Sequence, residues 1–375
     1  MTDKVYQKLA IHLDNLPGGF PPTESGVELR ILKRLFTPEQ AALALHLTLI
    51  SEEPRVVARR AGIDTAEAAD RLEEMAKQGL ILRIEPEDTG KPLQYMAAQF
   101  VIGIWEFHVN DLDTELIKDM NEYIPVLTEE AWKVPQLRTI PVGRSISVQT
   151  EVLPYEKAEE IIRSQKKILV APCICRRESR MAGHGCDKPE ESCLVFGTGA
   201  DYYQRNGLGR VIDQQEAFDI LEKANEAGLV LQPGNTREIL NICCCCGCCC
   251  QVLKAFKRRE KPVSMAATAF VAVADPDTCS GCEICMDRCQ MEALQIVNDH
   301  ITVNRDRCIG CGLCVSTCPA ESLTLARKPE SDQLTVPRDI VKAAIQLGKA
   351  RGKLGPGKLI SMVVKSKVDR LLAAK

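Results

Sequence analysis

Apolar positions in the N-terminal quarter of the chain recur at helical spacing, and short polar or glycine-rich breaks separate the groups. Thr37 followed by Pro38 predicts a helix start, because threonine caps the first turn and proline suits the first helical position. The same spacing predicts two further helices, over 54–60 and 64–78. The N-terminal region is therefore predicted to be mainly helical.

Two short apolar segments, 80–84 and 93–96, flank a turn around 88–90 and predict a β-hairpin. Helices followed by a hairpin resemble a winged helix, a fold that usually binds DNA, so we expect a winged-helix-like domain over 1–98. The region carries more acidic than basic side chains, and the helix before the hairpin is itself acidic. Because an acidic surface repels phosphate, DNA binding is disfavoured and a protein-docking module is predicted.

Composition is typical of a soluble globular protein, with 45% hydrophobic and 26% charged residues. Aromatic residues make up only 4%, so the cores must rest on aliphatic side chains, which favours helical packing. The N-terminal residues lack the basic start and apolar run of a signal peptide, and no apolar stretch is long enough to span a bilayer. We therefore expect a cytoplasmic protein without an integral membrane segment.

Cysteine divides the rest of the chain into regions. All 19 cysteines lie after residue 172, eleven of them within 171–260 and eight within 265–327. A cysteine-free connecting segment over 99–170 precedes them, and a basic helical tail is predicted over 328–375. In a reducing cytoplasm this density indicates metal or redox chemistry instead of structural disulfides, and it suggests an anaerobic host.

Two cysteine runs with the same spacing, C-x₂-C-x₂-C-x₃-C, stand over 279–289 and 308–318. This is the run of bacterial ferredoxins, in which three cysteines hold one [4Fe–4S] cluster and the fourth reaches across to the other. Cluster 1 is therefore assigned to Cys279, Cys282, Cys285 and Cys318. Cluster 2 is assigned to Cys308, Cys311, Cys314 and Cys289. Two four-cysteine zinc sites are the alternative, but such sites seldom show this doubled, interlocked spacing.

The surroundings of the two runs repeat as well. A short apolar strand follows each run, and the residues over 297–303 predict a hairpin between the halves, which makes a pseudo-twofold repeat. Gln290 stands where proline usually follows the fourth cysteine, a change that loosens a turn but removes no ligand. His300 is expected in the hairpin turn as a solvated residue.

The cysteines of the middle region show no regular spacing. Seven of the eight residues over 243–250 are cysteines, and thiols at this density indicate thiolates held by metal. The predicted ligands are Cys173, Cys175, Cys186, Cys193, Cys243, Cys245, Cys246, Cys248 and Cys249. A further iron–sulfur cluster is favoured because a ferredoxin module lies next in the chain, and a structural zinc site is the alternative.

Other residues of the middle region are assigned smaller roles. Arg176 and Arg177 would offset the negative charge of thiolates, and His184 is expected to be a loop residue instead of a ligand. A helix is predicted over 214–227, with Asp213 as its cap. The spacing of the cysteines does not tell which of them bind together.

The order of these segments resembles a group of incompletely characterised 4Fe–4S proteins of anaerobic bacteria. The resemblance covers about 152–326 and rests on the residues Pro172–Arg176, Cys186–Pro189, Cys193, Cys243–Cys250 and the two ferredoxin runs. It implies an iron–sulfur electron-transfer component. It also implies that Cys244 is an extra thiol, where such proteins have a polar residue.

The tail over 328–375 is strongly basic, whereas the rest of the chain is acidic overall. Apolar and basic residues alternate over 358–375, which predicts an amphipathic helix. Such a helix could lie on an anionic membrane surface, dock on an acidic partner or pack on its own chain, and the last is preferred.

The whole predicts an α+β multidomain protein with a winged-helix-like N-terminal domain, a cysteine-rich α/β middle, and a two-cluster ferredoxin-like domain with a helical tail. The preferred function is electron transfer between redox protein partners, because no nucleotide-binding motif and no catalytic constellation stands out. One alternative is a redox-sensing transcriptional regulator that uses the winged helix. The other is a reductase subunit with a substrate-binding cluster in the middle region.

Overall fold

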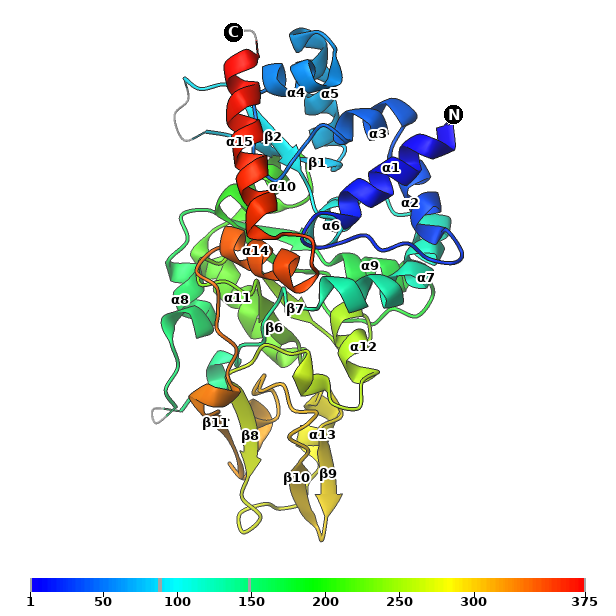
Figure 1. Cartoon of the computed structure of the whole chain (residues 1–375). Helices are drawn as coiled ribbons and strands as arrows, with labels where there is room; N and C mark the ends of the chain where they lie inside the picture. The colour runs from blue at the N-terminus through cyan, green and yellow to red at the C-terminus, as the bar shows by residue number, and fades with distance from the viewer. Residues whose placement is uncertain (1, 87–89, 148–149, 374–375) are drawn as a thin grey trace. The chain divides into compact units, whose positions relative to one another are not determined.

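Residues 2–86, 90–147 and 150–373 are described by the structure, a computed structural model (Figure 1). The chain divides into two compact units. The first contains the chain up to Val134, Asp201–Leu208 and the chain from Ala344, and the second contains Pro135–Ala200 and Gly209–Ala343. This grouping cuts across the predicted boundaries at 98, 170 and 328, because the connecting segment and the tail are each shared between the units.

Helices and one hairpin build the first unit. Its helices are α1 (Thr2–Asp14), α2 (Val27–Leu35), α3 (Pro38–Ala44), α4 (Pro54–Ala61), α5 (Thr65–Lys77), α6 (Trp105–Phe107), α7 (Thr114–Ala131) and α15 (Pro356–Leu372). Its strands β1 (Ile81–Ile84) and β2 (Gln94–Ala97) pair in antiparallel fashion. Two helices, α10 (Gly197–Arg205) and α14 (Ile340–Ala350), contain residues of both units.

The helix signals predicted for the N-terminal region are confirmed. Thr37 caps α3 by accepting a hydrogen bond from the backbone N–H of Gln40, whose side chain accepts one from Thr37 in return. Asp64 accepts hydrogen bonds from the first turn of α5 in the same way. The hairpin also forms, although residues 88 and 89 of its predicted turn lie outside the described residues.

Helix α15 packs on α4 within the first unit. Asp369 forms ion pairs with Arg59 and Arg60, each at 2.6 Å, and Arg60 also pairs with the buried Glu52. Several apolar side chains of α15 nevertheless stay exposed: Ile360, Val363, Val364, Val368, Leu371 and Leu372. Binding of this helix to a membrane surface stays a prediction. Among the described residues, no helix has both the length and the apolar character that a membrane span needs.

A five-stranded sheet forms the middle of the second unit. Its order is β5-β3-β4-β7-β6, with β3 (Ile168–Pro172), β4 (Glu191–Phe196), β5 (Arg210–Ile212), β6 (Val230–Pro233) and β7 (Asn241–Cys245). Every neighbouring pair in it is antiparallel, so the middle is not the parallel sheet that an α/β description denotes. Helices α8 (Ala158–Arg163), α9 (Ile174–Met181), α11 (Gln214–Glu226) and α12 (Gln251–Lys257) lie between or beyond these strands in sequence.

The register of this sheet separates two sets of side chains. Val170, Leu194 and Ile242 lie opposite one another on neighbouring strands, and all three are fully buried. Residues directly opposite in an antiparallel pair share a face, and neighbours along a strand point to opposite faces. Cys193 and Cys243, which are also register partners, therefore lie on the other face of the sheet.

Residues 270–327 form two small antiparallel ladders, visible as separate pairs of arrows in Figure 1. Strand β8 (Phe270–Ala274) pairs with β11 (Leu323–Arg327), and β9 (Leu294–Val297) pairs with β10 (His300–Val303); α13 (Ile284–Arg288) follows the first cysteines. The predicted hairpin is confirmed, with Asn298 and Asp299 as the left-handed residues of its turn (φ 52° and 62°). His300 is not in the turn, because it pairs with Val297 as the first residue of β10.

An extended segment over 137–142 ties the five-stranded sheet to the 270–327 ladders. The backbone N–H of Ile140 donates to Leu231 in β6 (3.1 Å), while that of Thr139 donates to Ala267 (2.8 Å). The N–H of Val142 donates to the carbonyl oxygen of Cys311 (3.0 Å). Both cysteine-containing regions therefore belong to one unit of the fold.

Candidate metal centres

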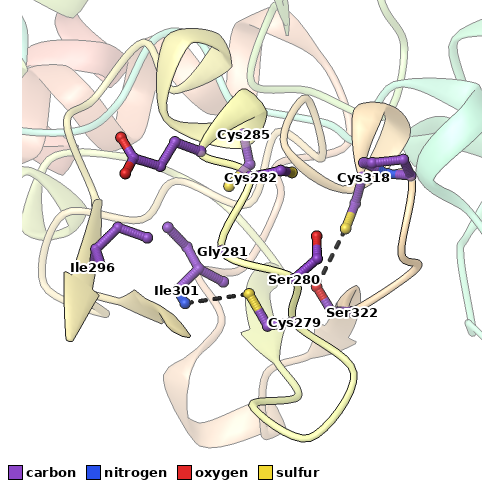
Figure 2. A pocket seen from close by; sticks show the side chains of 11 residues that line it. Cys279, Ser280, Gly281, Cys282, Cys285, Ile296, Ile301, Cys318 and Ser322 are labelled. Atoms are coloured by element: carbon purple, nitrogen blue, oxygen red, sulfur yellow. Dashed lines mark hydrogen bonds between the residues drawn. The ribbon is translucent and has the colours of Figure 1, made fainter. Parts of the chain in front are cut away.

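Four cysteines of the two runs line one pocket, which we call the first ferredoxin site. They are Cys279, Cys282, Cys285 and Cys318. Figure 2 shows these side chains around a hollow that Ile296 and Ile301 also line. The pocket contains about 310 Å³ of empty space, part of it open to solvent. Three of its cysteines come from the first run and one from the second, which is the crossed combination that the spacing predicts.

Hydrogen-bond donors face the sulfur atoms of this site. The backbone N–H of Ile301 donates to Cys279 Sγ at 3.4 Å, and the Ser322 hydroxyl lies 3.2 Å from Cys318 Sγ (Figure 2). The N–H groups of Ile301 and Gly281 lower the pKa of the Cys279 thiol. Burial by itself raises the pKa of Cys318, but Ser322 and nearby N–H groups outweigh it and lower that pKa. The thiols of Cys279 and Cys318 therefore lose their protons more easily than a free cysteine, whereas burial raises the pKa of Cys285 to about 11.

The other four cysteines of the runs line a second pocket of about 370 Å³, the second ferredoxin site. They are Cys289, Cys308, Cys311 and Cys314. Ala272 and Ala293 donate backbone N–H bonds to Cys308 Sγ (3.4 Å) and Cys289 Sγ (3.2 Å). Cys308 and Cys314 are buried, whereas Cys282 of the first site is exposed, so the second site is less accessible to water. Burial raises the pKa of the Cys311 thiol to about 12.

The loop of the second ferredoxin site requires glycine. Gly310 has a φ of +65°, and a Cβ atom there would lie 2.3 Å from the backbone oxygen of Phe270 in β8. Any larger residue would push the loop away from the strand. The small residue therefore sets how closely Cys308 and Cys311 approach the ladder that supplies the N–H donors.

Ten of the eleven middle cysteines fall into two groups, and six of these form what we call the six-thiol set: Cys173, Cys175, Cys193, Cys243, Cys245 and Cys250. Their thiols make successive contacts: Cys193 with Cys243, Cys243 with Cys245, Cys245 with Cys250, Cys250 with Cys175, and Cys175 with Cys173. Strands β4 and β7 supply three of them, and the starts of α9 and α12 supply the others.

Cys250 is a member of this set that the sequence prediction left out. It is the residue before α12, and the backbone N–H groups of Val252 and Leu253 approach its sulfur. Hydrogen bonds from Cys175 and Cys245 lower the pKa of Cys250 well below its usual value, and the helix N–H groups add to this effect. The helix start that follows the cysteine run was the signal that could have identified it.

The other group, the four-thiol set, consists of Cys186, Cys246, Cys248 and Cys249. Their sulfur atoms all lie within 4.8 Å of one another. The separations are 3.9 Å for Cys186–Cys246, 3.6 Å for Cys186–Cys249 and 3.8 Å for Cys248–Cys249. Cys246 and Cys249 are buried, while Cys248 is exposed.

Cys244 belongs to neither set. It lies opposite Leu231 in the sheet register, next to Ile242 on the apolar face, and it is 1% exposed. Burial raises the pKa of its thiol to about 12, which keeps it protonated at neutral pH. The extra thiol is thus a small apolar residue of the core in this structure.

Arg176 lies beside both thiol sets. Its guanidinium is fully buried and donates to the backbone oxygens of Pro189 and Cys244, both at 2.5 Å, and to Ser192. It also contacts the Cys246 thiol. Burial alone would lower its pKa, but the nearby thiolates, Cys173 first, raise it. Arg177 instead pairs with Glu190 at 2.6 Å. His184 is exposed, as expected for a loop residue.

Gln290, which stands in place of the usual proline, connects the two cysteine-containing regions. Its side-chain oxygen accepts a hydrogen bond from the backbone N–H of Gly247 at 2.6 Å. A Cβ atom on Gly247 would lie 2.5 Å from the Gln290 backbone oxygen, so glycine is needed for this approach. Gln290 follows a cysteine of the second ferredoxin site, and Gly247 lies between two cysteines of the four-thiol set. The glutamine that replaces the usual proline therefore provides a contact between the two cysteine-containing regions.

The chain was also compared with known proteins. The family model of the 4Fe-4S dicluster domain matches residues 272–325. This match supports an iron–sulfur, ferredoxin-like domain in that part of the chain. Searches of curated proteins and of solved structures gave no match. The donor set agrees with the family, because thiolates that receive backbone N–H bonds are the ligands that iron–sulfur clusters use.

Proposed function

We propose that this chain is an iron–sulfur electron-transfer protein that exchanges single electrons with redox protein partners. The main observation that supports this proposal is that two pockets are each lined by four cysteines, three from one run and one from the other. Cys279, Cys282, Cys285 and Cys318 would hold one [4Fe–4S] cluster, and Cys308, Cys311, Cys314 and Cys289 would hold the second. Such clusters, when bound, supply one-electron transfer without a proton acceptor.

The protein's own residues give the two sites different surroundings. In the first ferredoxin site Cys282 is exposed, so a partner protein can approach that loop. In the second site Cys308 and Cys314 are buried, and Gln290 joins the adjacent turn to Gly247 of the cysteine-rich region. We therefore assign the first site to contact with an external partner and the second to contact with the middle of the chain.

The six-thiol set is the proposed place of a third iron–sulfur centre. It offers more thiols than one four-iron cluster needs, and its successive contacts link β4, β7 and the starts of α9 and α12. Hydrogen bonds among its thiols, and those at the start of α12, favour thiolates at Cys243 and Cys250. Arg176 supplies a buried positive charge beside Cys173 and Cys245 of the same set.

The winged-helix-like part of the first unit is proposed to dock a protein partner instead of DNA. The arginines that could bind phosphate are already engaged, since Arg59 and Arg60 pair with Asp369 of α15. Arg55 donates to the backbone oxygens of Arg370 and Ala373. Helix α5 is acidic, and its Arg71 pairs with Glu67 of the same helix. This arrangement disfavours the transcriptional regulator.

The direct test is quantitation of iron and acid-labile sulfide in the anaerobically purified full chain, with EPR spectra of the reduced protein. About eight iron atoms per chain would be held by the two ferredoxin sites, and about twelve would include the six-thiol set. Reduced [4Fe–4S] signals that disappear on addition of an oxidised acceptor protein are expected. Fewer than eight iron atoms after reconstitution, or a reduced protein without such signals, would contradict the proposal.

A further inference from the structure

The four-thiol set differs in its spacing from every other cysteine group of the chain. Its four sulfur atoms all lie within 4.8 Å of one another. Within 2–86, 90–147 and 150–373, no other group of three or more histidine, cysteine or acidic residues brings its ligand atoms so close together. The eight ferredoxin cysteines do not form such a group, although all of them are described. Their sulfur atoms are spread more widely around larger hollows.

This spacing matches a single tetrahedral ion. A zinc ion binds thiolates at about 2.3 Å, so the edges of its sulfur tetrahedron measure about 3.8 Å. Three sulfur–sulfur distances in the four-thiol set, at 3.6, 3.8 and 3.9 Å, are close to this edge length. In a four-iron cluster each thiolate binds a different iron atom, which requires a wider arrangement. We infer that Cys186, Cys246, Cys248 and Cys249 bind one zinc ion, separately from the iron–sulfur sites.

The surroundings fit four thiolates around one ion. The backbone N–H of Lys188 donates a hydrogen bond to the sulfur of Cys186. Arg176 contacts Cys246 and offsets part of the charge of −2 that four thiolates leave on a divalent ion. Four protein ligands fill the coordination of the ion, as in structural zinc sites, so no position remains for a substrate.

Zinc is assigned in preference to a single iron ion. Tetrahedral thiolate sites accept either metal, but the same ligands bind Zn²⁺ more tightly than Fe²⁺ in the order of divalent metal affinities. A metal that does not change its oxidation state also suits a position between two redox regions. There it can fix the geometry of the chain without accepting electrons.

The structural consequence is a clamp on the cysteine-rich region. The ion joins Cys186, in the loop after α9, to the turn before α12 that contains the other three ligands. These two segments adjoin the six-thiol set, because Arg176 on α9 lies beside it and Cys250 at the start of α12 is one of its members. The same turn holds Gly247, which donates to Gln290 next to the second ferredoxin site. The zinc ion thus fixes the junction between the thiol groups.

The test compares metal contents of the anaerobically purified full chain and of three variants. The unmodified protein is expected to hold about one zinc ion per chain. Cys186→Ser and Cys248→Ser should lose that zinc and keep the iron content, and Cys248 is exposed, so its replacement should not prevent folding. Cys244→Ala, the control within the same run, should keep both metals. X-ray absorption at the zinc edge should show four sulfur ligands at about 2.3 Å.

The opposite outcomes overturn the inference. A protein that contains no zinc, even when zinc is supplied during folding, has no such site. Loss of several iron atoms from Cys248→Ser would assign the set to a cluster, and loss of a single iron atom would assign it to mononuclear iron. The EPR signals of the ferredoxin sites are recorded on the same samples. A failure of the zinc site is therefore distinguishable from a failure of the proposed electron-transfer function.

Discussion

The ferredoxin runs and the cysteine-rich middle both gather thiols, but they do so by different means. In each run, three ligands of one site come from seven consecutive residues, and glycines with positive φ bend the loop around the pocket. In the middle, the six-thiol set combines β4, β7 and the starts of α9 and α12. One kind of site is built by local chain geometry, and the other by the register of a sheet.

The difference decides what supports each site. A local loop needs only its glycines and a few N–H donors, such as Ile301 and Ala272. A site assembled from distant segments needs the sheet to form first, and it needs a charge that the loops cannot supply. Arg176 supplies this charge, because it is buried beside both thiol sets and donates hydrogen bonds to two backbone oxygens. The middle should thus be the more sensitive region to changes outside its ligands.

The largest effect is expected from Arg176→Met. The variant leaves thiolates without a buried counter-charge and removes hydrogen bonds to Pro189 and Cys244, so the free energy of unfolding should fall by about 3–5 kcal/mol. Anaerobic denaturant titration, followed by cluster absorbance, measures this change. Arg177→Met is the matched control, since its half-buried pair with Glu190 should cost below about 1 kcal/mol. Equal effects of the two variants would remove Arg176 from its assigned role.

A change in the ferredoxin region should be next in size. Gly310→Ala combines a strained φ of +65° with a Cβ atom 2.3 Å from the Phe270 oxygen, so we expect a loss of about 2–4 kcal/mol. Iron should leave the second ferredoxin site, whereas the first keeps its EPR signal. Gly183→Ala has a similar φ of +80° in open space and should cost about 1–2 kcal/mol. If Gly310→Ala kept full iron content and stability, the loop would not depend on its close approach to β8.

The same contrast explains which features were predictable from sequence. The eight ferredoxin cysteines, their crossed grouping into two pockets and the hairpin between the halves follow from spacing, because each depends on neighbours in the chain. The division of the middle cysteines does not follow from spacing. Cys244 and Cys245 are adjacent in sequence, but strand alternation sends one into the apolar core and the other toward the six-thiol set.

Contacts between distant segments were also beyond the sequence. Gln290 could be recognised as a departure from the usual proline, but only the fold brings it to Gly247. Likewise, the pairing of Asp369 with Arg59 and Arg60 depends on a tail that returns to α4 from the far end of the chain. Such partners have no fixed spacing, so periodicity and motifs do not reveal them.

A smaller effect is expected where the two regions meet. Gln290→Ala removes the hydrogen bond to Gly247, which should lower the free energy of unfolding by about 1 kcal/mol. Hydrogen exchange at the Gly247 amide should become faster, while iron and zinc contents stay the same. The exposed Gln295 offers the control, and Gln295→Ala should leave this exchange rate unchanged. An unchanged rate in Gln290→Ala would show that the two regions are not joined through this residue.

The smallest effect should come from a single donor at the first ferredoxin site. The Ser322 hydroxyl lies 3.2 Å from Cys318 Sγ, and a hydrogen bond to sulfur stabilises the more negative, reduced state. Sulfur is a weak acceptor, so we expect a net contribution of about 0.5 kcal/mol, which corresponds to about 20 mV for one electron. Ser322→Ala should therefore lower one reduction potential by about this amount. Redox titration followed by EPR measures both clusters in one sample. Ser322 lines the first ferredoxin pocket and not the second, so the potential of the second cluster should stay constant. Equal shifts of both potentials would contradict the assignment of Cys318 to the first site.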